Sequence, residues 1–133
     1  MPDADIEAVK RLHKALARAD ADAICAAVTP DFSWHMIGLS EFPIGQLRQG
    51  GQGMVDYLTD LLAVIEFQRV TRHTYLERGS TVVSLGSARG RVKANGKTVE
   101  TDYVQVFEVR DGKVARAREY VDADAFRAVL PQP

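Results

Sequence analysis

The fold is decided by residues 81–122, which have the sequence TVVSLGSARGRVKANGKTVETDYVQVFEVRDGKVARAREYVD. Two turn signals, Asn-Gly at 95–96 and Asp-Gly at 111–112, divide this stretch into long segments rich in Val, Tyr, Phe and Thr. A third signal, Gly-Ser at 79–80, separates it from another such segment, residues 68–77. The pattern predicts an antiparallel meander of four strands.

Two of the predicted strands, residues 81–94 and 97–110, are far longer than the usual ~5–6 residues. Strands of this length have to bend, and Gly86 and Gly90 provide positions at which the backbone can do so. The sequence therefore predicts a strongly curved sheet that wraps around the helices of the N-terminal half.

The Asn-Gly signal at 95–96 favours a two-residue turn. Counting outward from such a turn brings Arg91 opposite Glu100 and Arg89 opposite Asp102, which are two pairs of opposite charge on one face. The other, concave face is then predicted to be apolar.

The Asp-Gly signal at 111–112 leaves two alternatives. A two-residue turn places Arg116 and Arg118 on the concave face, whereas a three-residue loop with Gly112 in the left-handed conformation places Glu119 there. We favour the three-residue loop, because burying two arginines costs far more than burying one carboxyl group.

Small and apolar residues dominate the resulting concave face, which predicts a cavity. Glu119 lies across from Tyr103 on this face, with Gln105 beside it. A carboxyl group among apolar neighbours is expected to have a raised pKa, as a general acid or base needs. The alternative is a rim position or a bond to a backbone amide. The predicted face consists of Gly86, Ala88, Gly90, Thr101, Tyr103, Gln105, Phe107, Ala115, Ala117, Glu119 and Val121.

The N-terminal half shows apolar residues at helical spacing, interrupted by one short strand and one glycine-rich loop. Pro30 is expected to end the second helix. The predicted elements are a helix over 6–19, a short helix over 21–28, a strand over 32–37, a loop over 38–53 and a third helix over 54–65.

Composition restricts the class of protein. The 133 residues suffice for one domain, predicted to span 1–133, and 17 basic against 18 acidic residues argue against a nucleic-acid partner. One Cys and three His offer no metal-type spacing, and no apolar run approaches the ~20 residues that cross a membrane. The start of the chain lacks a secretory pattern, so a cytoplasmic location is expected.

A helix pair, a strand, a glycine-rich loop, a third helix and a meander containing VFEVRDGKV at 106–114 together resemble the nuclear transport factor 2-like superfamily. Within it, the chain is similar to the SnoaL-like polyketide cyclases, ketosteroid isomerases and limonene-epoxide hydrolases. The most specific segment is REYVD at 118–122, followed by Phe126. The resemblance implies an α+β class with a cone-shaped α+β barrel, in which a strongly curved, mostly antiparallel sheet wraps around about three N-terminal helices.

The resemblance also implies roles for single residues. Glu119 corresponds to the Asp that activates water in the epoxide hydrolases. His35 falls where the isomerases have their Asp base, and Tyr57 matches a tyrosine that supports their hydrogen-bond network. The resemblance thus implies a proton exchange between His35 and Glu119. The alternatives are a core histidine bonded to backbone and, for Tyr57, plain core packing.

Other positions differ from the known catalytic sets. Gln105 stands where the isomerases have a protonated Asp, and Gly86 and Ala88 stand where the epoxide hydrolases have catalytic Arg and Asp. The chain is therefore predicted to be a small acid–base enzyme of cyclase or isomerase type that acts on a mainly apolar small molecule without cofactor or metal. The predicted substrate-binding residues are Tyr57, Ala88, Tyr103 and Gln105. The alternative is a non-catalytic module for small-ligand binding or dimerisation.

The outer face of the sheet is predicted to be too apolar for bare solvent, which favours a homodimer formed through it. His73 shares a face with Thr71 and Tyr75, and the pattern leaves open whether that face is inner or outer. The predicted outer face contains Leu85, Val104, Val106, Arg116 and Arg118.

Overall fold

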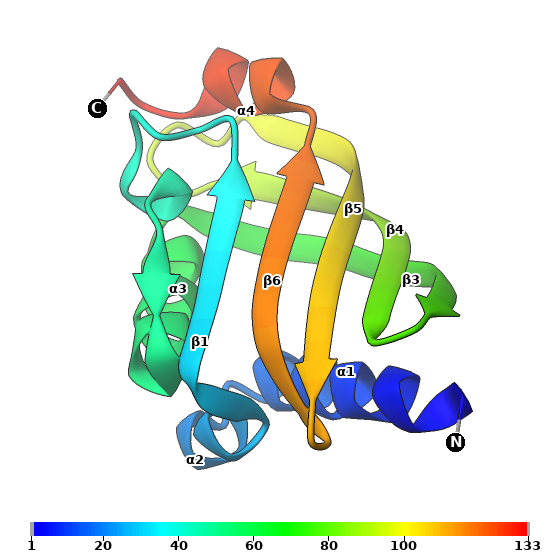
Figure 1. Ribbon diagram of the computed structural model, residues 1–133. Coiled ribbons are helices and arrows are strands. Elements are labelled where there is room, and N and C mark those ends of the chain that lie inside the picture. The colour runs from blue at the N-terminus through cyan, green and yellow to red at the C-terminus, as the bar shows by residue number, and fades with distance from the viewer. Residues whose placement is uncertain (1, 133) are drawn as a thin grey trace.

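The computed structural model describes residues 2–132, which form four α-helices, one short 3-10 helix and six strands (Figure 1). The helices are α1 (Pro2–Ala17), α2 (Ala21–Ala26), α3 (Gly50–Val64) and α4 (Ala123–Val129), with the 3-10 helix η1 (Pro43–Gly45). The strands are β1 (Val28–Ile37), β2 (Arg48–Gln49), β3 (Ile65–Arg78), β4 (Thr81–Val92), β5 (Thr98–Arg110) and β6 (Lys113–Val121).

All six strands belong to one open sheet with the order β2-β1-β6-β5-β4-β3. The strands β3 to β6 form the predicted antiparallel meander, and β1 pairs in parallel with β6. The sheet curves so strongly that β3 and β4 cross behind β1, β6 and β5 in Figure 1. The predicted α+β class with a curved, mostly antiparallel sheet is confirmed.

Several elements of the structure differ from the prediction. The predicted loop over 38–53 contains η1 and β2, and α3 begins at Gly50 instead of residue 54. Strand β1 begins at Val28 and contains Pro30, which was expected only to end the preceding helix. The β1–β6 pairing is irregular between Val28 and Ser33, so the missing N–H of Pro30 falls where the ladder is interrupted. Helix α4 was not predicted; the Asp122 side chain caps it by accepting a hydrogen bond from the Ala125 N–H.

The hairpin between β4 and β5 is longer than the two-residue turn predicted at 95–96. The Val92 N–H donates to the Lys97 carbonyl, so that four residues form the connection, and Arg89 pairs with Glu100 instead of Asp102. The predicted register is therefore wrong by two residues. Because side chains alternate with a period of two, the even shift leaves every residue on its predicted face.

The hairpin between β5 and β6 is a two-residue turn, since Arg110 pairs with Lys113 and both Asp111 and Gly112 have positive φ. The predicted three-residue loop is therefore wrong. The extra residue lies instead in a bulge after Val114, where the register shifts. Beyond the bulge Ala117 and Glu119 face inward, as predicted, whereas before it Val114 is buried in place of the predicted Ala115.

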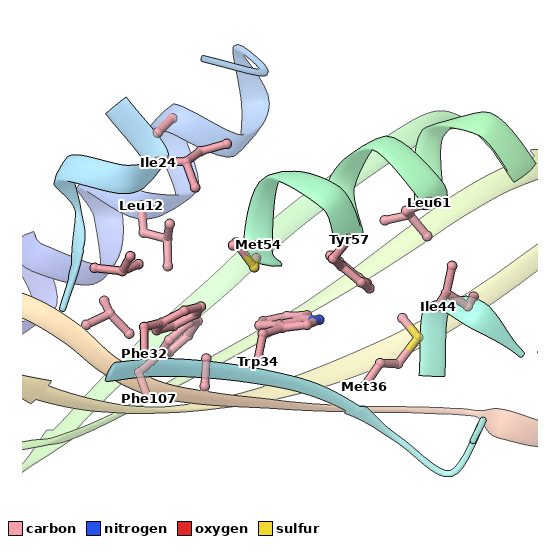
Figure 2. Packing of buried hydrophobic residues seen from close by; sticks show 14 of the residues in the cluster. Leu12, Ile24, Phe32, Trp34, Met36, Ile44, Met54, Tyr57, Leu61 and Phe107 are labelled. Atoms are coloured by element: carbon pink, nitrogen blue, oxygen red, sulfur yellow. The ribbon is translucent and has the colours of Figure 1, made fainter. Parts of the chain in front are cut away.

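The hydrophobic core lies between the concave face of the sheet and helices α1 and α3. Figure 2 shows Trp34 and Met36 projecting from β1 toward Tyr57 and Leu61 of α3. Helix α1 contributes Leu12, which is fully buried. The apolar stripes of the two helices thus close the open side of the sheet and enclose the space that forms the site.

Candidate active site

A cavity of about 370 Å³ lies between the concave face of the sheet and the helices. Its wall is mainly apolar, and its few polar groups come from β3, β5 and β6 together with Tyr57 of α3. The lining residues are Leu16, Ala17, Ala19, Trp34, Met36, Met54, Tyr57, Leu58, Leu61, Leu62, Phe67, Val70, Arg72, Ala88, Thr101, Tyr103, Gln105, Glu119, Val121 and Phe126. A concave, mostly apolar space with a few polar groups is typical of a small-molecule site.

The polar centre of this cavity is the pair Gln105 and Glu119. The two residues are direct partners across β5 and β6, and the Gln105 Nε2–H donates to Glu119 Oε2 over 2.5 Å. Glu119 is only 8% exposed, and burial raises its pKa to about 7 although the Gln105 hydrogen bond and the Arg72 charge both act to lower it. The carboxyl group therefore exchanges a proton near neutral pH. The structure corrects one detail of the prediction, because Tyr103 pairs with Val121 rather than lying across from Glu119.

His13 on α1 extends this pair into a chain of hydrogen bonds. Its Nε2 lies 2.8 Å from Gln105 Oε1, and its Nδ1 lies 2.7 Å from the hydroxyl of Tyr75. Burial lowers the pKa of His13 to about 3, with a further contribution from the Arg72 charge, so the imidazole is neutral at pH 7.

The direction of these hydrogen bonds follows from which atoms can donate and which can accept. Gln105 donates to the Glu119 carboxylate with its amide nitrogen, so its oxygen faces His13 and requires a hydrogen on Nε2 of the imidazole. The Nδ1 atom of His13 is then the acceptor for the Tyr75 hydroxyl. Three donors in series thus point toward Glu119, and they fix the orientation of its carboxylate. The amide of Gln105 does not relay protons efficiently, so these hydrogen bonds position Glu119 rather than supplying it with protons.

Trp34 of β1 and Tyr57 of α3 line the cavity beside β6, the strand that carries Glu119. Their ring centroids lie 5.0 Å apart, and both side chains are almost completely buried. Burial, aided by the negative charge of Glu119, raises the pKa of Tyr57 well above its usual range, so its hydroxyl stays protonated. The Trp34 Nε1–H is also buried, and a hydrogen bond between Trp34 and the Tyr57 hydroxyl acts in the opposite direction on the pKa of Tyr57.

Tyr103 occupies a position that depends on a glycine. A Cβ atom at Gly86 would lie 2.2 Å from both the Tyr103 hydroxyl and the Thr71 carbonyl oxygen, so no side chain fits there. The Tyr103 hydroxyl donates to that carbonyl over 3.3 Å, and burial raises its pKa. Gly86 thus leaves the room in which Tyr103 reaches across β4 to β3.

Comparison with known proteins places the chain in a family. Residues 9–117 match the SnoaL-like domain family. The chain belongs to this family. Among curated proteins, none matches the chain with significance.

Solved structures show the same fold as this SnoaL-like chain. An NTF2-like protein from Burkholderia xenovorans is 26% identical, with a TM-score of 0.88, and 98% of each chain is covered. TerC, co-crystallised with polyporic acid, is also 26% identical, with a TM-score of 0.82 over 95% of this chain and 97% of that one. An LEH-like epoxide hydrolase from M. tuberculosis is 23% identical, with a TM-score of 0.74 over 97% and 90% of the two chains. The predicted resemblance is therefore confirmed.

The structure overturns the predicted placement of His35. Alternation along β1 does separate His35 from Trp34, as expected, but Trp34 and Met36 are the residues that face the cavity. His35 lies on the opposite face, where its Nε2 is 3.1 Å from the Gly45 carbonyl oxygen. A one-residue difference in alignment to the isomerases exchanges the two faces of a strand. The SnoaL-like cavity therefore brings Glu119 together with His13 and not with His35.

The four predicted substrate-binding residues Tyr57, Ala88, Tyr103 and Gln105 all line the cavity. Whether they bind a substrate stays a prediction.

Two polar residues of the site escaped the sequence analysis. His13 stands between Leu12 and Leu16 on the apolar stripe of α1, and a histidine on such a stripe was the available signal. Arg72 was hidden because β3 has irregularities between Phe67 and Arg69 and between Arg72 and Thr74, which break its alternation.

The irregularity between Arg72 and Thr74 also determines the face on which His73 lies. It is exposed, and its Nε2 lies 3.3 Å from Ser87 Oγ, whereas Tyr75 bonds to the buried His13. The two residues therefore do not share a face.

Among residues 4–132, no group of three or more His, Cys, Asp or Glu side chains is placed to hold a metal ion. None of the helices described in the structure is both long enough and apolar enough to cross a membrane.

Proposed function

We propose that the chain is a small acid–base enzyme of cyclase or isomerase type, which acts on a mainly apolar small molecule in the cavity with Glu119 as its proton acceptor and donor. The observation that carries this proposal is the position of Glu119. Its carboxyl group is buried in an apolar wall, held by Gln105, and has a pKa of about 7. Such a group accepts a proton and returns it at neutral pH without a large energetic cost in either direction.

The proposed reaction begins at a carbon acid next to a carbonyl group. The Glu119 carboxylate takes the proton, and the electron pair of the broken C–H bond forms a C=C bond while the carbonyl oxygen becomes negatively charged. Return of the proton to a different carbon gives an isomer. If the carbanion carbon instead attacks a second carbonyl group in the molecule, a ring closes and the new alkoxide takes the proton from Glu119. Both outcomes leave the enzyme unchanged.

The Tyr57 hydroxyl is the proposed donor to the developing negative charge. Burial raises its pKa and keeps it protonated at neutral pH, whereas the Tyr103 hydroxyl already donates to the Thr71 carbonyl. Hydrogen-bond donors in a water-poor site stabilise an oxyanion far better than they do in water. This replaces the predicted proton exchange with His35, which lies outside the cavity.

The relatives support the proposal in general terms. Solved structures of the same fold are described as a SnoaL-like polyketide cyclase from Jannaschia sp. and as an epoxide hydrolase. TerC, which is 26% identical, was crystallised with polyporic acid, and this favours a cavity that takes a small organic molecule. The same observation supports the second candidate, a module that binds such a molecule without converting it.

Ring opening of 5-nitrobenzisoxazole tests the proposal, because this neutral compound needs only the loss of one carbon-bound proton to give a coloured phenolate. We expect the native chain to catalyse it, with kcat/KM rising with pH and levelling off above about pH 7, where Glu119 is ionised. Glu119→Gln should lower kcat/KM by about 100-fold or more, within the range of general-base catalysis.

The matched control is Glu66→Gln, since Glu66 is an exposed residue of β3 outside the cavity lining. This variant should keep the native rate. Equal rates for the native chain and the folded Glu119→Gln variant would contradict the assignment. Binding of the compound without any turnover would favour the non-catalytic module.

A second copy of the chain is the proposed partner, through the outer face of the sheet. Val104 and Tyr120 are paired on this face and are 38% and 39% exposed. Light scattering after size-exclusion chromatography should give twice the chain mass, and Val104→Asp combined with Tyr120→Asp should give a monomer. Leu47→Asp, at an exposed apolar position between η1 and β2, outside the face of the sheet, is the control and should stay dimeric. An unchanged mass in the double variant would contradict this interface.

A further inference from the structure

Arg72 is a cationic group of the cavity that the proposed reaction leaves without a role. It projects from β3 into the lining, and its side chain is partly buried. Its Nε–H is buried without a hydrogen-bond partner, and no ion pair joins Arg72 to any carboxylate of residues 2–132. A buried guanidinium donor normally has an acceptor, because an unpaired one retains its full desolvation cost.

The nearest acidic candidate within the chain does not serve as this acceptor. Glu119 is bonded to Gln105, and no oxygen of Glu119 lies within ion-pair distance of Arg72. The Arg72 charge also acts to lower the pKa values of His13, Tyr75 and Tyr103 through its electrostatic interaction with them. None of these three groups is an anion at neutral pH. Arg72 therefore has no direct ion-pair partner among the described side chains, although its charge acts on Glu119 from a longer distance.

Arg72 lies close to Gly86 and Tyr103 in the sheet. Arg72 pairs with Gly86 on β4, and Gly86 pairs in turn with Tyr103 on β5. The Tyr103 hydroxyl fills the space over Gly86 and donates to the Thr71 carbonyl. The guanidinium of Arg72 is therefore the donor without an ion-pair partner in this part of the wall, which suits an anionic oxygen.

We propose that the cavity takes an apolar molecule that carries an anionic oxygen, a carboxylate or an acidic enol or phenol, with this oxygen bound by Arg72. The inference rests on the proposed function only in taking the cavity as a small-molecule site, and it specifies the class of substrate. Leu58, Leu61, Phe67 and Val70 contact the apolar part of the molecule.

Calorimetric titration with 2-naphthoate and 2-naphthamide tests this proposal, since the two compounds share their apolar rings and differ in charge. The native chain should bind naphthoate at least tenfold more tightly than naphthamide. Arg72→Met should abolish this preference while it binds naphthamide as the native chain does. Arg72→Lys should retain part of the preference, because it keeps the charge but loses the planar fork.

The matched control is Arg69→Met, since Arg69 is an exposed arginine of the same strand that is absent from the cavity lining. It should leave the preference unchanged. A native chain that favours the amide or binds neither compound would overturn the proposal, and so would an Arg72→Met variant that retains the preference. If Arg72→Met does not fold, Arg72→Lys and the native preference decide.

The two proposals fail separately. Ring opening of the neutral 5-nitrobenzisoxazole depends on Glu119 and needs no anion site, whereas the preference for naphthoate depends on Arg72. Loss of the first with the second intact would reject the acid–base enzyme and keep the anion site. The reverse result would reject the anion site alone.

Discussion

Glu119 and Glu100 belong to neighbouring strands of one sheet, yet the pKa values of their carboxyl groups are shifted in opposite directions from that of an ordinary glutamate. Glu119 faces the cavity, and burial raises its pKa to about 7. Glu100 lies on the outer face, where a hydrogen bond from Arg89 and then the charge of that arginine lower its pKa. The face of the sheet, and not the residue type, decides whether a carboxylate is a proton acceptor or an ordinary ion-pair partner.

The two carboxyl groups also differ in the charge of their hydrogen-bond partners. Glu100 has an arginine 2.9 Å away, whereas Glu119 has only the neutral amide of Gln105 as a hydrogen-bond partner. A neutral donor orients the carboxylate without stabilising its charge strongly. This combination of fixed orientation and raised pKa is suited to proton transfer.

The largest expected effect is on the pH dependence of stability in Glu119→Gln. Folded Glu119 titrates near pH 7 and the unfolded residue near 4.5, so the folded state holds more protons between these values and native stability falls as pH rises. The variant lacks this loss, so its stability relative to the native chain should increase by about 3 kcal/mol from pH 4.5 to 7. Urea unfolding at fixed protein concentration measures it. A difference that stays constant with pH would show that the native carboxyl group is not buried as described.

A smaller effect is expected when His13 is replaced by leucine. The change removes the donor to Gln105 Oε1 and the acceptor for the Tyr75 hydroxyl, and an unpaired buried polar group costs about 1–3 kcal/mol. The hydrogen bonds from His13 through Gln105 also position Glu119, so kcat for 5-nitrobenzisoxazole should fall together with stability.

The loss of stability in His13→Leu should shrink at acid pH. The pKa of folded His13 is about 3 against 6.5 in the unfolded chain, so the native protein loses stability from this group as pH falls below 6.5, and the variant does not. The matched control His73→Leu, at an exposed histidine of β3, should change stability by no more than about 0.5 kcal/mol. Equal effects of the two substitutions would contradict the described role of His13.

The inner face of the sheet was predictable from the sequence because it depends only on alternation. The turn at 95–96 was assigned with the wrong length, and the loop at 111–112 was assigned in place of a bulge. In both cases, Tyr103, Gln105 and Glu119 still faced inward. An error of two residues in register does not change which side chains share a face, whereas an error of one residue does. His35 shows the second case, since its assignment to the cavity came from an alignment and not from the pattern of burial.

The series of hydrogen bonds that positions Glu119 was not predictable in the same way. Its hydrogen bonds join residues 92 and 62 positions apart, from His13 to Gln105 and from His13 to Tyr75. No local periodicity relates a helix at the N-terminus to strands so distant in sequence. Arg72 was missed for a related reason, because irregular pairing in β3 interrupts the alternation that would have assigned it to the inner face.

The smallest expected effect is that of Glu100→Gln, which sharpens the comparison because it makes the same chemical change on the other face. The lowered pKa keeps Glu100 ionised in the folded state, and the unfolded residue is ionised above pH 4.5 as well. Its contribution to stability is therefore constant above pH 4.5 and is lost only as pH falls below that value. Between pH 4.5 and 7, the unfolding curves of this variant should keep a constant offset from those of the native chain, while Glu119→Gln diverges. A divergence of Glu100→Gln in that interval would mean that the outer face perturbs its carboxylates as the cavity does, and burial would then no longer explain the behaviour of Glu119.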